Sequence, residues 1–291
     1  YHLRSFFMSA ALIDGKAISE AVRKEWRKRA DNLKAKGVLP GLAVIIVGDN
    51  AASKLYVSNK IKACHEVGLH SEVHDLPEDV SEKILLKLIE KLNEAIKING
   101  ILVQLPLPKH ISESKVLEMI KQDKDVDGFH LYNVGALMTG NTVFPPCTPF
   151  GVMRMLDYCK VKISGQNAVI VGRSNIVGKP MAIMLLQEDA TVTICTSKTK
   201  ELEKHTLNAD ILVVATGRPE MIKSGHVKPG AVVIDVGINR LESGKLVGDV
   251  DFEDVKKVAS LITPVPGGVG PMTITMPVSY THLTLPTKRI V

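Results

Sequence analysis

Tyr56 and Lys60 stand four residues apart in a segment with helical periodicity, so both side chains lie on one face of a helix. A lysine that is desolvated in a cleft becomes a usable acid or base near neutral pH, and a neighbouring tyrosine can hydrogen-bond it or stack on a flat substrate. Gln104 ends an apolar strand, where a polar side chain reaches a cleft at the carboxyl edge of a sheet. Each of these signals is weak on its own. Tyr56 and Lys60 could be an ordinary surface pair, and Gln104 could simply stand at an exposed end of a strand.

Three carboxylates, Asp123, Asp125 and Asp127, form the pattern D-K-D-V-D-G. This pattern resembles the opening of a calcium-binding EF-hand loop, but the twelfth position is Val134 instead of glutamate. We therefore expect no calcium here. Acid–base chemistry by one lysine calls for no other metal either. A carboxylate in this loop could instead accept paired N–H groups of a heterocycle.

Gly172 and Gly178 follow the apolar run "NAVIVG" and stand at the head of a helical segment. Glycine lets the backbone approach a pyrophosphate, and a helix N-terminus offers free N–H groups. The spacing departs from G-x-G-x-x-G, and a plain turn glycine is the alternative for Gly172. The next strand ends in Cys195–Lys198 without the acid that binds an NAD ribose. Arg173 and Ser197 can meet a 2′-phosphate, so the sequence predicts NADP, with NAD less favoured.

Alternating strands and helices surround these residues. In the first half, strands are expected at 42–48, 70–76 and 100–108, with helices at 53–68 and 81–97. In the second half the strands are "NAVIVG", "TVTICT", "DILVVATG" and "AVVIDVG". Parallel strands need crossover connections, so this alternation predicts an α/β fold. We expect two domains, an N-terminal α/β substrate domain and a C-terminal Rossmann-like doubly wound parallel sheet, with the active-site cleft between them.

The composition excludes several protein classes. The 291 residues are 45% apolar and 23% charged, as in a globular protein with a sizeable core. Lys and Arg exceed Asp and Glu by 37 to 31, and only by 34 to 31 without the three basic residues of the chain ends. This small, dispersed excess indicates no nucleic-acid partner. The short apolar runs indicate no membrane span. Four cysteines without a CxxC pair read as free thiols, which favours a cytoplasmic location.

Both chain ends differ from the rest. Residues 1–7 precede Met8, which begins a natural-looking start, and "PVSYTHLTLPTKRIV" after Met276 has two prolines and no helical periodicity. We expect 1–7 and 277–291 to be non-native. The middle segment 123–149 is rich in Gly, Pro, Asn and Asp, which predicts a long loop or domain junction.

Four blocks together resemble the bifunctional methylenetetrahydrofolate dehydrogenase/methenyltetrahydrofolate cyclohydrolase family, of bacterial type. They are "VGDNAASKLYVSNK", "GILVQLPLPKH" with "KDVDGFH", "VGRSNIVGKP" and "PGGVGPMT", and the resemblance runs from about Ala11 to Met276. It implies an oxidoreductase and hydrolase of one-carbon metabolism and purine biosynthesis. The enzyme would oxidise 5,10-methylenetetrahydrofolate with NADP and hydrolyse the methenyl product to 10-formyltetrahydrofolate.

The resemblance also implies roles for individual residues. Lys60 would be the central catalytic residue, Gln104 would tune it, Tyr56 would lie against the substrate rings, and Asp127 would bind the pterin N–H groups. The dinucleotide site would be lined by Gly172, Arg173, Ser174, Ser197 and Ile238. The segment 264–273 would close over the substrate. The binding residues in it would be Pro264, Gly267, Gly268, Gly270 and Pro271.

The resemblance further implies a homodimer and the domain limits. The catalytic, folate-binding domain would cover 8–149, joined by 265–276, and the NADP-binding domain would cover 150–264. A C-terminal helix would pack back on the first domain. Because Pro277 and the unusual tail replace it, we expect an exposed apolar docking surface and lower stability.

Two alternatives stay open. A short-chain dehydrogenase also carries Tyr-x-x-x-Lys, although there the pair follows the nucleotide-binding glycines and here it precedes them. The altered C-terminus could also leave an inactive cofactor-binding remnant.

Overall fold

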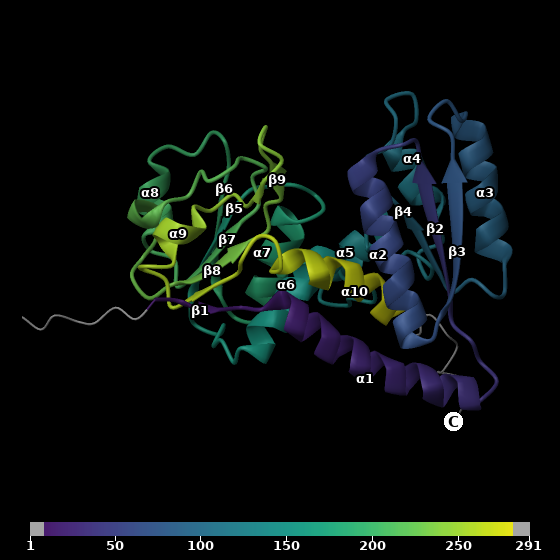
Figure 1. The fold of residues 1–291 in the computed structure, drawn as a ribbon, viewed down its shortest axis with the longest axis horizontal. Coiled ribbons are helices and arrows are strands. Elements are labelled where there is room, and N and C mark those ends of the chain that lie inside the picture. Colours follow the sequence, from purple (N-terminus) through teal and green to yellow (C-terminus); the bar gives the residue numbers. More distant parts are fainter. Residues whose placement is uncertain (1–8, 282–291) are drawn as a thin grey trace, which may run out of the picture. The chain divides into compact units, whose positions relative to one another are not determined.

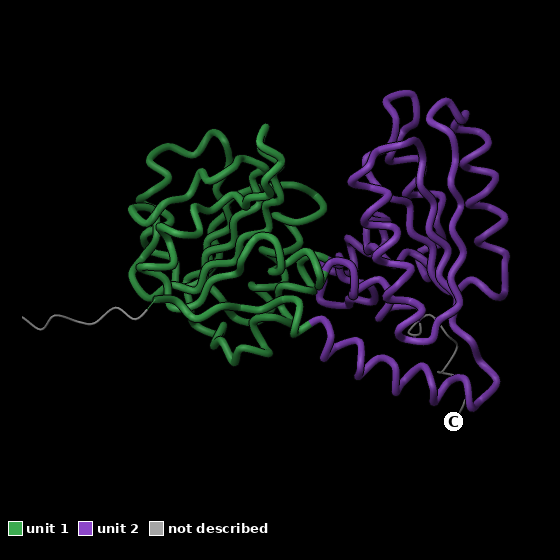
Figure 2. Tube along the Cα trace, viewed as in Figure 1, with its two compact units in different colours: residues 1–18, 148–272 green, residues 19–147, 273–291 purple. Residues whose placement is uncertain are grey.

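The computed structural model describes residues 9–281, and the chain forms two compact units. Unit 1 comprises the residues up to Ile18 together with Thr148–Met272, and unit 2 comprises Ser19–Cys147 together with the residues from Thr273 onward. Figure 2 draws them in two colours. No helix of the described part is long and apolar enough to cross a membrane.

Unit 2 is built on a three-stranded parallel sheet in the order β3-β2-β4. Its strands are β2 (Gly41–Val47), β3 (His70–Leu76) and β4 (Gly100–Val103). Every residue of β2 and β4 is buried, as a strand in a sheet covered on both faces requires. The apolar side chains of α3 (Glu82–Glu94) and α4 (Glu113–Met119) join one core with this sheet. Strands β2 and β3 and helix α3 lie close to where the sequence predicts them, whereas β4 ends at Val103 instead of Pro108 and α4 was not predicted.

Helix α2 (Ala51–Val67) carries two of the expected catalytic residues and has defined ends. The Asn50 side chain accepts a hydrogen bond from Ser53 N at the start, and Gly68 ends the helix with φ of 83°. The helix packs on β2 and β3, away from α3 (Figure 1). This packing holds the helix, and the two expected catalytic residues on it, against the sheet.

Unit 1 contains a six-stranded parallel sheet in the order β1-β11-β8-β7-β5-β6. Its strands are β1 (Ala11–Leu12), β5 (Asn167–Val171), β6 (Thr191–Cys195), β7 (Ile211–Val214), β8 (Val232–Asp235) and β11 (Leu261–Ile262). The short pair β9 (Asn239–Arg240) and β10 (Leu246–Val247) is antiparallel. The helical elements are α6 (Cys147–Tyr158), α7 (Gly178–Gln187), α8 (Leu202–Thr206), η1 (Ser224–His226) and α9 (Phe252–Val255).

The unit boundaries differ from the division expected from the sequence. The residues before Ile18 pack with unit 1, because β1 pairs in parallel with β11, and 265–272 belong to unit 1 as well. Helix α1 (Gly15–Ala35) runs from unit 1 into unit 2. The polar segment 123–149 also holds more structure than a loop, since α5 (Leu131–Met138) forms within it, capped by the His130 side chain, which accepts from Tyr132 N.

The end of the chain corrects the expectation that Pro277 and the residues after it replace the C-terminal helix. Helix α10 (Val269–Tyr280) does not stop at Met276 but continues through Pro277, and residues 277–281 are buried. The Tyr280 ring packs on Phe144 with centroids 5.9 Å apart, and the Thr281 hydroxyl lies near Gly100. Apolar burial outweighs the lack of periodicity in this stretch. The expected tail residues 1–7 and 282–291 lie outside the described residues.

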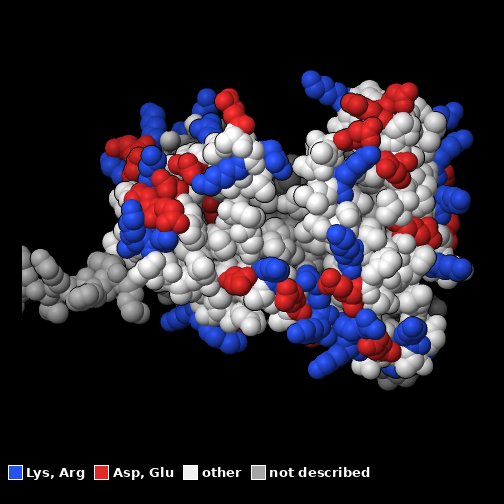
Figure 3. Space-filling model, viewed as in Figure 1, with Lys and Arg blue, Asp and Glu red and all other residues white. Residues whose placement is uncertain are grey.

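Charged side chains are interspersed on the surface, as the composition indicates. On the face in Figure 3, basic and acidic residues stand beside one another on each unit. Along α1, for example, Arg27 pairs with Asp31 and Arg29 with Glu25. Such exposed pairs contribute little to stability.

Candidate active site

Lys60 and Gln104 meet in unit 2, as the sequence-based assignment requires. Lys60 faces the sheet from α2 and is only 5% exposed, whereas Gln104 directly follows β4. The Lys60 ammonium donates to Gln104 Oε1 over 3.1 Å, and Gln104 Nε2 donates to Leu105 O over 2.8 Å. The second bond fixes which end of the amide faces the lysine, so Gln104 presents an acceptor to it.

Asp127 lies close enough to Lys60 for its charge to matter. Burial raises the pKa of Asp127 to about 6, while the positive charge of Lys60 acts to lower it and the neighbouring Asp125 acts to raise it. The Asp127 carboxylate and the Lys60 side chain therefore lie in one buried polar cluster with Gln104. Such a pair can bind a flat, polar heterocycle and exchange protons with it.

The three aspartates of D-K-D-V-D-G have different environments, although in the sequence only the resemblance to the family singled out Asp127. Asp123 is exposed. Asp125 is 1% exposed and accepts hydrogen bonds from Gly128 N, His130 N and Asn133 Nδ2. Asp125 therefore shapes the loop. Of the three, Asp127 has the carboxylate that lies next to Lys60.

Sequence reasoning missed Cys147, which it counted only as a free thiol. Cys147 is 3% exposed, its Sγ donates to Val126 O over 3.1 Å, and it lies beside Asp127. Burial and the nearby carboxylates raise its pKa well above the usual value. The thiol is therefore a neutral donor, and no sequence signal marks it, since it follows Asp127 by twenty residues.

Tyr56 lies one turn before Lys60 on α2 and is half-buried. Burial raises the pKa of its hydroxyl, so the phenol stays neutral at physiological pH. Its ring is available as a flat surface.

The glycine-rich loop of unit 1 has the close backbone packing expected of a phosphate site. Gly172 follows β5 with φ of 132°, and a Cβ there would overlap Ala215 O, at the end of β7. A Cβ at Gly178 would overlap Gly172 O in the same way. Ser174 Oγ accepts from Val177 N and Gly178 N over 3.1 and 3.3 Å, so the serine satisfies two backbone donors at the start of α7, although the N-cap residue is Val177.

The remaining expected cofactor residues lie at the same edge of this sheet. Arg173 follows β5, Ser197 follows β6, and Ile238 follows β8. All three side chains are exposed, Ile238 by 47%. Because parallel strands end at one edge, the sheet brings these three loops together there.

The expected folate-closing segment lies in unit 1. It begins between β11 and α10 and continues into the first turn of α10, and it contains Pro264, Gly267, Gly268, Gly270 and Pro271. It packs tightly on the chain start, because a Cβ at Gly15 would overlap Gly268 O and Lys16 N donates to Gly267 O over 3.1 Å. Gly267 has φ of 105°, which favours glycine.

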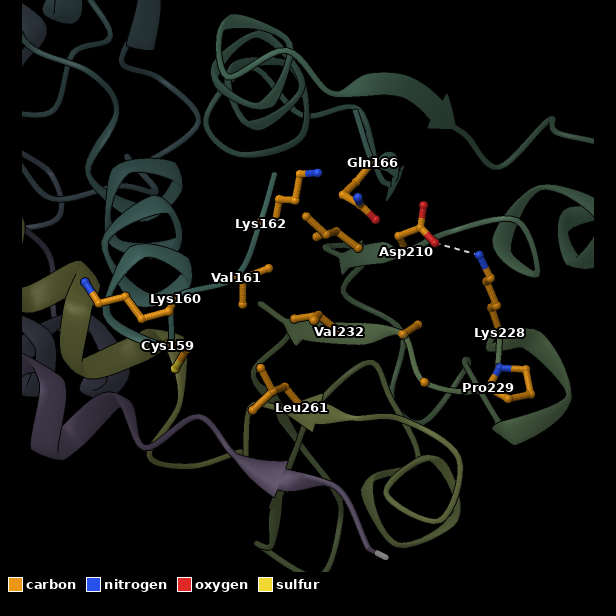
Figure 4. A pocket seen from close by; sticks show the side chains of 13 residues that line it. Cys159, Lys160, Val161, Lys162, Gln166, Asp210, Lys228, Pro229, Val232 and Leu261 are labelled. Atoms are coloured by element: carbon orange, nitrogen blue, oxygen red, sulfur yellow. Dashed lines mark hydrogen bonds and ion pairs between the residues drawn. The ribbon is translucent and has the colours of Figure 1, made fainter. Parts of the chain in front are cut away.

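A cavity of about 340 Å³ in unit 1 is not the cofactor site. Its lining contains the residues that begin β7, β8 and β11, so it lies at the amino edge of the sheet, opposite the loops described above. Figure 4 shows that the ammonium groups of Lys160 and Lys162 point in different directions, and Lys228 is paired with Asp210. Among the described residues, no group of three His, Cys, Asp or Glu side chains is placed to hold a metal ion.

Comparison with known proteins agrees with this geometry. Residues 13–127 match the tetrahydrofolate dehydrogenase/cyclohydrolase catalytic domain, and residues 146–287 match the NAD(P)-binding domain of the same family. The Bifunctional protein FolD of Nitrosospira multiformis is 64% identical over 269 residues, which are 92% of this chain and 93% of that protein. The FolD protein of Polynucleobacter asymbioticus is 61% identical, over 92% of this chain and 95% of its own length.

Solved structures give the same result. The bifunctional FolD methylenetetrahydrofolate dehydrogenase/cyclohydrolase of Campylobacter jejuni superposes with a TM-score of 0.93 at 52% identity, covering 95% of this chain and 99% of that one. The Trypanosoma brucei enzyme, complexed with NADP and an inhibitor, has a TM-score of 0.91 at 39% identity over 95% and 97% of the two chains. These likenesses do not favour a short-chain dehydrogenase. The chain belongs to the tetrahydrofolate dehydrogenase/cyclohydrolase family.

Proposed function

We propose that this protein oxidises 5,10-methylenetetrahydrofolate to the 5,10-methenyl form and hydrolyses that product to 10-formyltetrahydrofolate. The observation that carries the proposal is the buried Lys60, bonded to Gln104 and close to Asp127, in a domain that matches the family's catalytic domain. The oxidation transfers a hydride to a bound dinucleotide, which requires chiefly proximity and orientation. The hydrolysis adds water to a cationic carbon, and the protons released need an acceptor.

Lys60 would accept such a proton at Nζ as the neutral amine and so become the ammonium. Gln104 Oε1 holds the Lys60 nitrogen in one place, and burial of this side chain to 5% exposure keeps bulk water away from it. Asp127 would accept N–H groups of the pterin, and Tyr56 would lie against its rings. Pro264, Gly267, Gly268, Gly270 and Pro271 would contribute backbone that closes over the folate. By ligand, we propose 8–149 with 265–276 as the folate-binding part and 150–264 as the dinucleotide-binding part. This division differs from the compact units, in which the residues up to Ile18 and 265–272 belong to unit 1.

The dinucleotide would bind at the carboxyl edge of the unit 1 sheet. The residues present fit it, since Gly172 and Gly178 have no Cβ and let the chain pack closely in the turn between β5 and the N-terminus of α7, where a phosphate would bind. The dinucleotide supplies the hydride acceptor. NADP is favoured over NAD because Arg173 and Ser197 are exposed at this edge and no acid ends β6. A tenfold preference for NAD would contradict this choice.

Membership of the family also supports proposals for the oligomeric state and the cellular location. We propose that the protein forms a homodimer through the nucleotide-binding part. We further propose a cytoplasmic location, where folate and dinucleotide are both present. Size-exclusion chromatography with light scattering measures the first proposal directly.

The test is a spectrophotometric assay with 5,10-methylenetetrahydrofolate and either NADP or NAD, together with hydrolysis of added methenyl substrate. Lys60→Ala is compared with Lys62→Ala, a matched control on the exposed face of α2. We expect NADP-dependent oxidation in the wild type and loss of hydrolysis in Lys60→Ala alone. A folded wild type that binds NADP without either activity would instead support an inactive remnant.

A further inference from the structure

Two buried carboxylates lie at the carboxyl edge of the unit 1 sheet without a role in the chemistry above. Asp235 is the last residue of β8 and is 3% exposed, and Asp249 follows β10 and is fully buried. Their hydrogen-bond partners are backbone N–H groups and neutral side chains. Buried carboxylates are costly, so their placement here needs a reason.

Asp249 joins the loop after β7 to the loop after β8. Its Oδ2 accepts from Thr216 N, from the Thr216 hydroxyl over 3.0 Å and from Gly217 N over 2.9 Å. Its Oδ1 accepts from Asn239 Nδ2 over 2.8 Å. One carboxylate therefore fixes two loops that are neighbours at this edge of the sheet (Figure 1).

Asp235 holds the other side of the same arrangement. Its Oδ1 accepts from Gly237 N over 2.9 Å and from Asp249 N over 3.0 Å, and its Oδ2 accepts from Val250 N over 2.9 Å. Asp235 thus fixes the turn that leaves β8 and also the backbone that carries Asp249. The two carboxylates form one connected network.

Two glycines make room for this network. A Cβ at Gly237 would overlap the Asp249 carboxylate, and a Cβ at Gly248 would overlap the Asp235 carboxylate. The backbone passes so closely over each carboxylate that the loop has little freedom to shift. Burial raises the pKa of Asp235 to about 7, so three N–H donors do not fully offset its desolvation.

Ile238 stands in the middle of the fixed loop. Its neighbours Gly237 and Asn239 are both bonded to the network, whereas Ile238 itself is 47% exposed at the edge where the dinucleotide would bind. We propose that Asp235 and Asp249 are positioning residues for the dinucleotide, which hold the loops at 216–217 and 236–239 in the conformation that binds it. This inference rests on the proposed dinucleotide site.

The test measures NADP affinity directly by isothermal titration calorimetry, with both activities as further readouts. In Asp249→Asn the amide keeps one acceptor oxygen, so it cannot satisfy the donors on both sides of the carboxylate. We expect the Kd and the KM for NADP to rise tenfold or more. Hydrolysis of the methenyl substrate, measured without dinucleotide, stays within twofold, which a general loss of structure would not allow.

A matched control lies at the opposite edge of the same sheet. Asp210 accepts from Asn167 N over 2.9 Å and pairs with Lys228. Asp210→Asn is expected to leave the Kd for NADP within twofold. A milder variant, Asn239→Ala, keeps both carboxylates and removes one donor, and we expect it to raise the Kd two- to fivefold.

The outcomes separate this inference from the proposed function. A wild type that does not bind NADP contradicts both. A wild type that binds NADP, with Asp249→Asn binding equally well, overturns the positioning role alone. If Asp249→Asn does not fold, Asn239→Ala decides, and an unchanged Kd in that variant likewise overturns the role.

Discussion

Replacement of Tyr280 by alanine tests whether the unusual end of the chain is part of the core. Tyr280 is 2% exposed and lies in the last turn of α10, where its ring packs on Phe144 at 5.9 Å between centroids and 59° between planes. The sequence alone suggested that this stretch leaves an apolar surface uncovered. The structure instead makes Tyr280 a central contact of unit 2.

The magnitude follows from the burial and the ring contact. Truncating a buried aromatic side chain to alanine costs about 3–5 kcal/mol, because the removed atoms leave a cavity. About 0.5–1.5 kcal/mol of that belongs to the aromatic pair itself. At roughly 2–4 °C per kcal/mol for a chain of this size, the Tm should fall by about 6–20 °C.

The assay is thermal unfolding followed by circular dichroism, with two comparison variants. Tyr280→Phe keeps the ring and should retain most of the stability. Tyr132→Ala removes a tyrosine that is 55% exposed in the same unit, and it should change the free energy of unfolding by no more than about 0.5 kcal/mol. If Tyr280→Ala behaves like Tyr132→Ala, residues 277–281 do not pack in the core and the reasoning from their burial is refuted.

Three further predictions concern the two sites. Gln104→Leu removes the acceptor of Lys60, so hydrolysis should fall by about 10²–10⁴ while NADP affinity, measured by titration, stays unchanged. Asp127 has a pKa raised to about 6, so it loses its charge as pH falls through 6, and kcat/KM for the folate should drop about tenfold per pH unit below that value. Asp127→Asn should lack this inflection, and a wild-type profile flat from pH 5 to 8 would contradict the assignment. Gly172→Ala places a Cβ against Ala215 O, so it should lower both the Tm and the affinity for NADP; unchanged values would mean that the loop is not tightly packed.

The periodicity of the sequence was enough to predict most elements of the fold. The apolar runs that became β2, β5, β7 and β8 are fully or almost fully buried strands, and a strand of this kind must be covered on both faces, which indicates parallel strands with helical crossovers. The strand ends then bring polar residues such as Gln104 and Arg173 to a single edge of each sheet. The order of the short blocks along the chain identified the family.

Tertiary structure decided which polar residues act together. The D-K-D-V-D-G pattern by itself offered Asp123, Asp125 and Asp127 alike, and only the resemblance to the family singled out Asp127. The fold buries Asp125 under its own loop and leaves Asp127 near Lys60. Which aspartate faces Lys60 depends on contacts between segments that are far apart in the sequence. The pattern of neighbouring residues does not encode such contacts.

The same reason explains three features that the sequence did not predict. Cys147, the first residue of α6, lies beside Asp127, and Asp235 accepts a hydrogen bond from Asp249 N across a separation of 14 residues. The end of the chain gave no helical period, yet the apolar surface around Phe144 buries Tyr280 and draws α10 past Pro277. Local propensity determined the elements of this protein, whereas burial in the folded units determined where the elements end and which side chains form its sites.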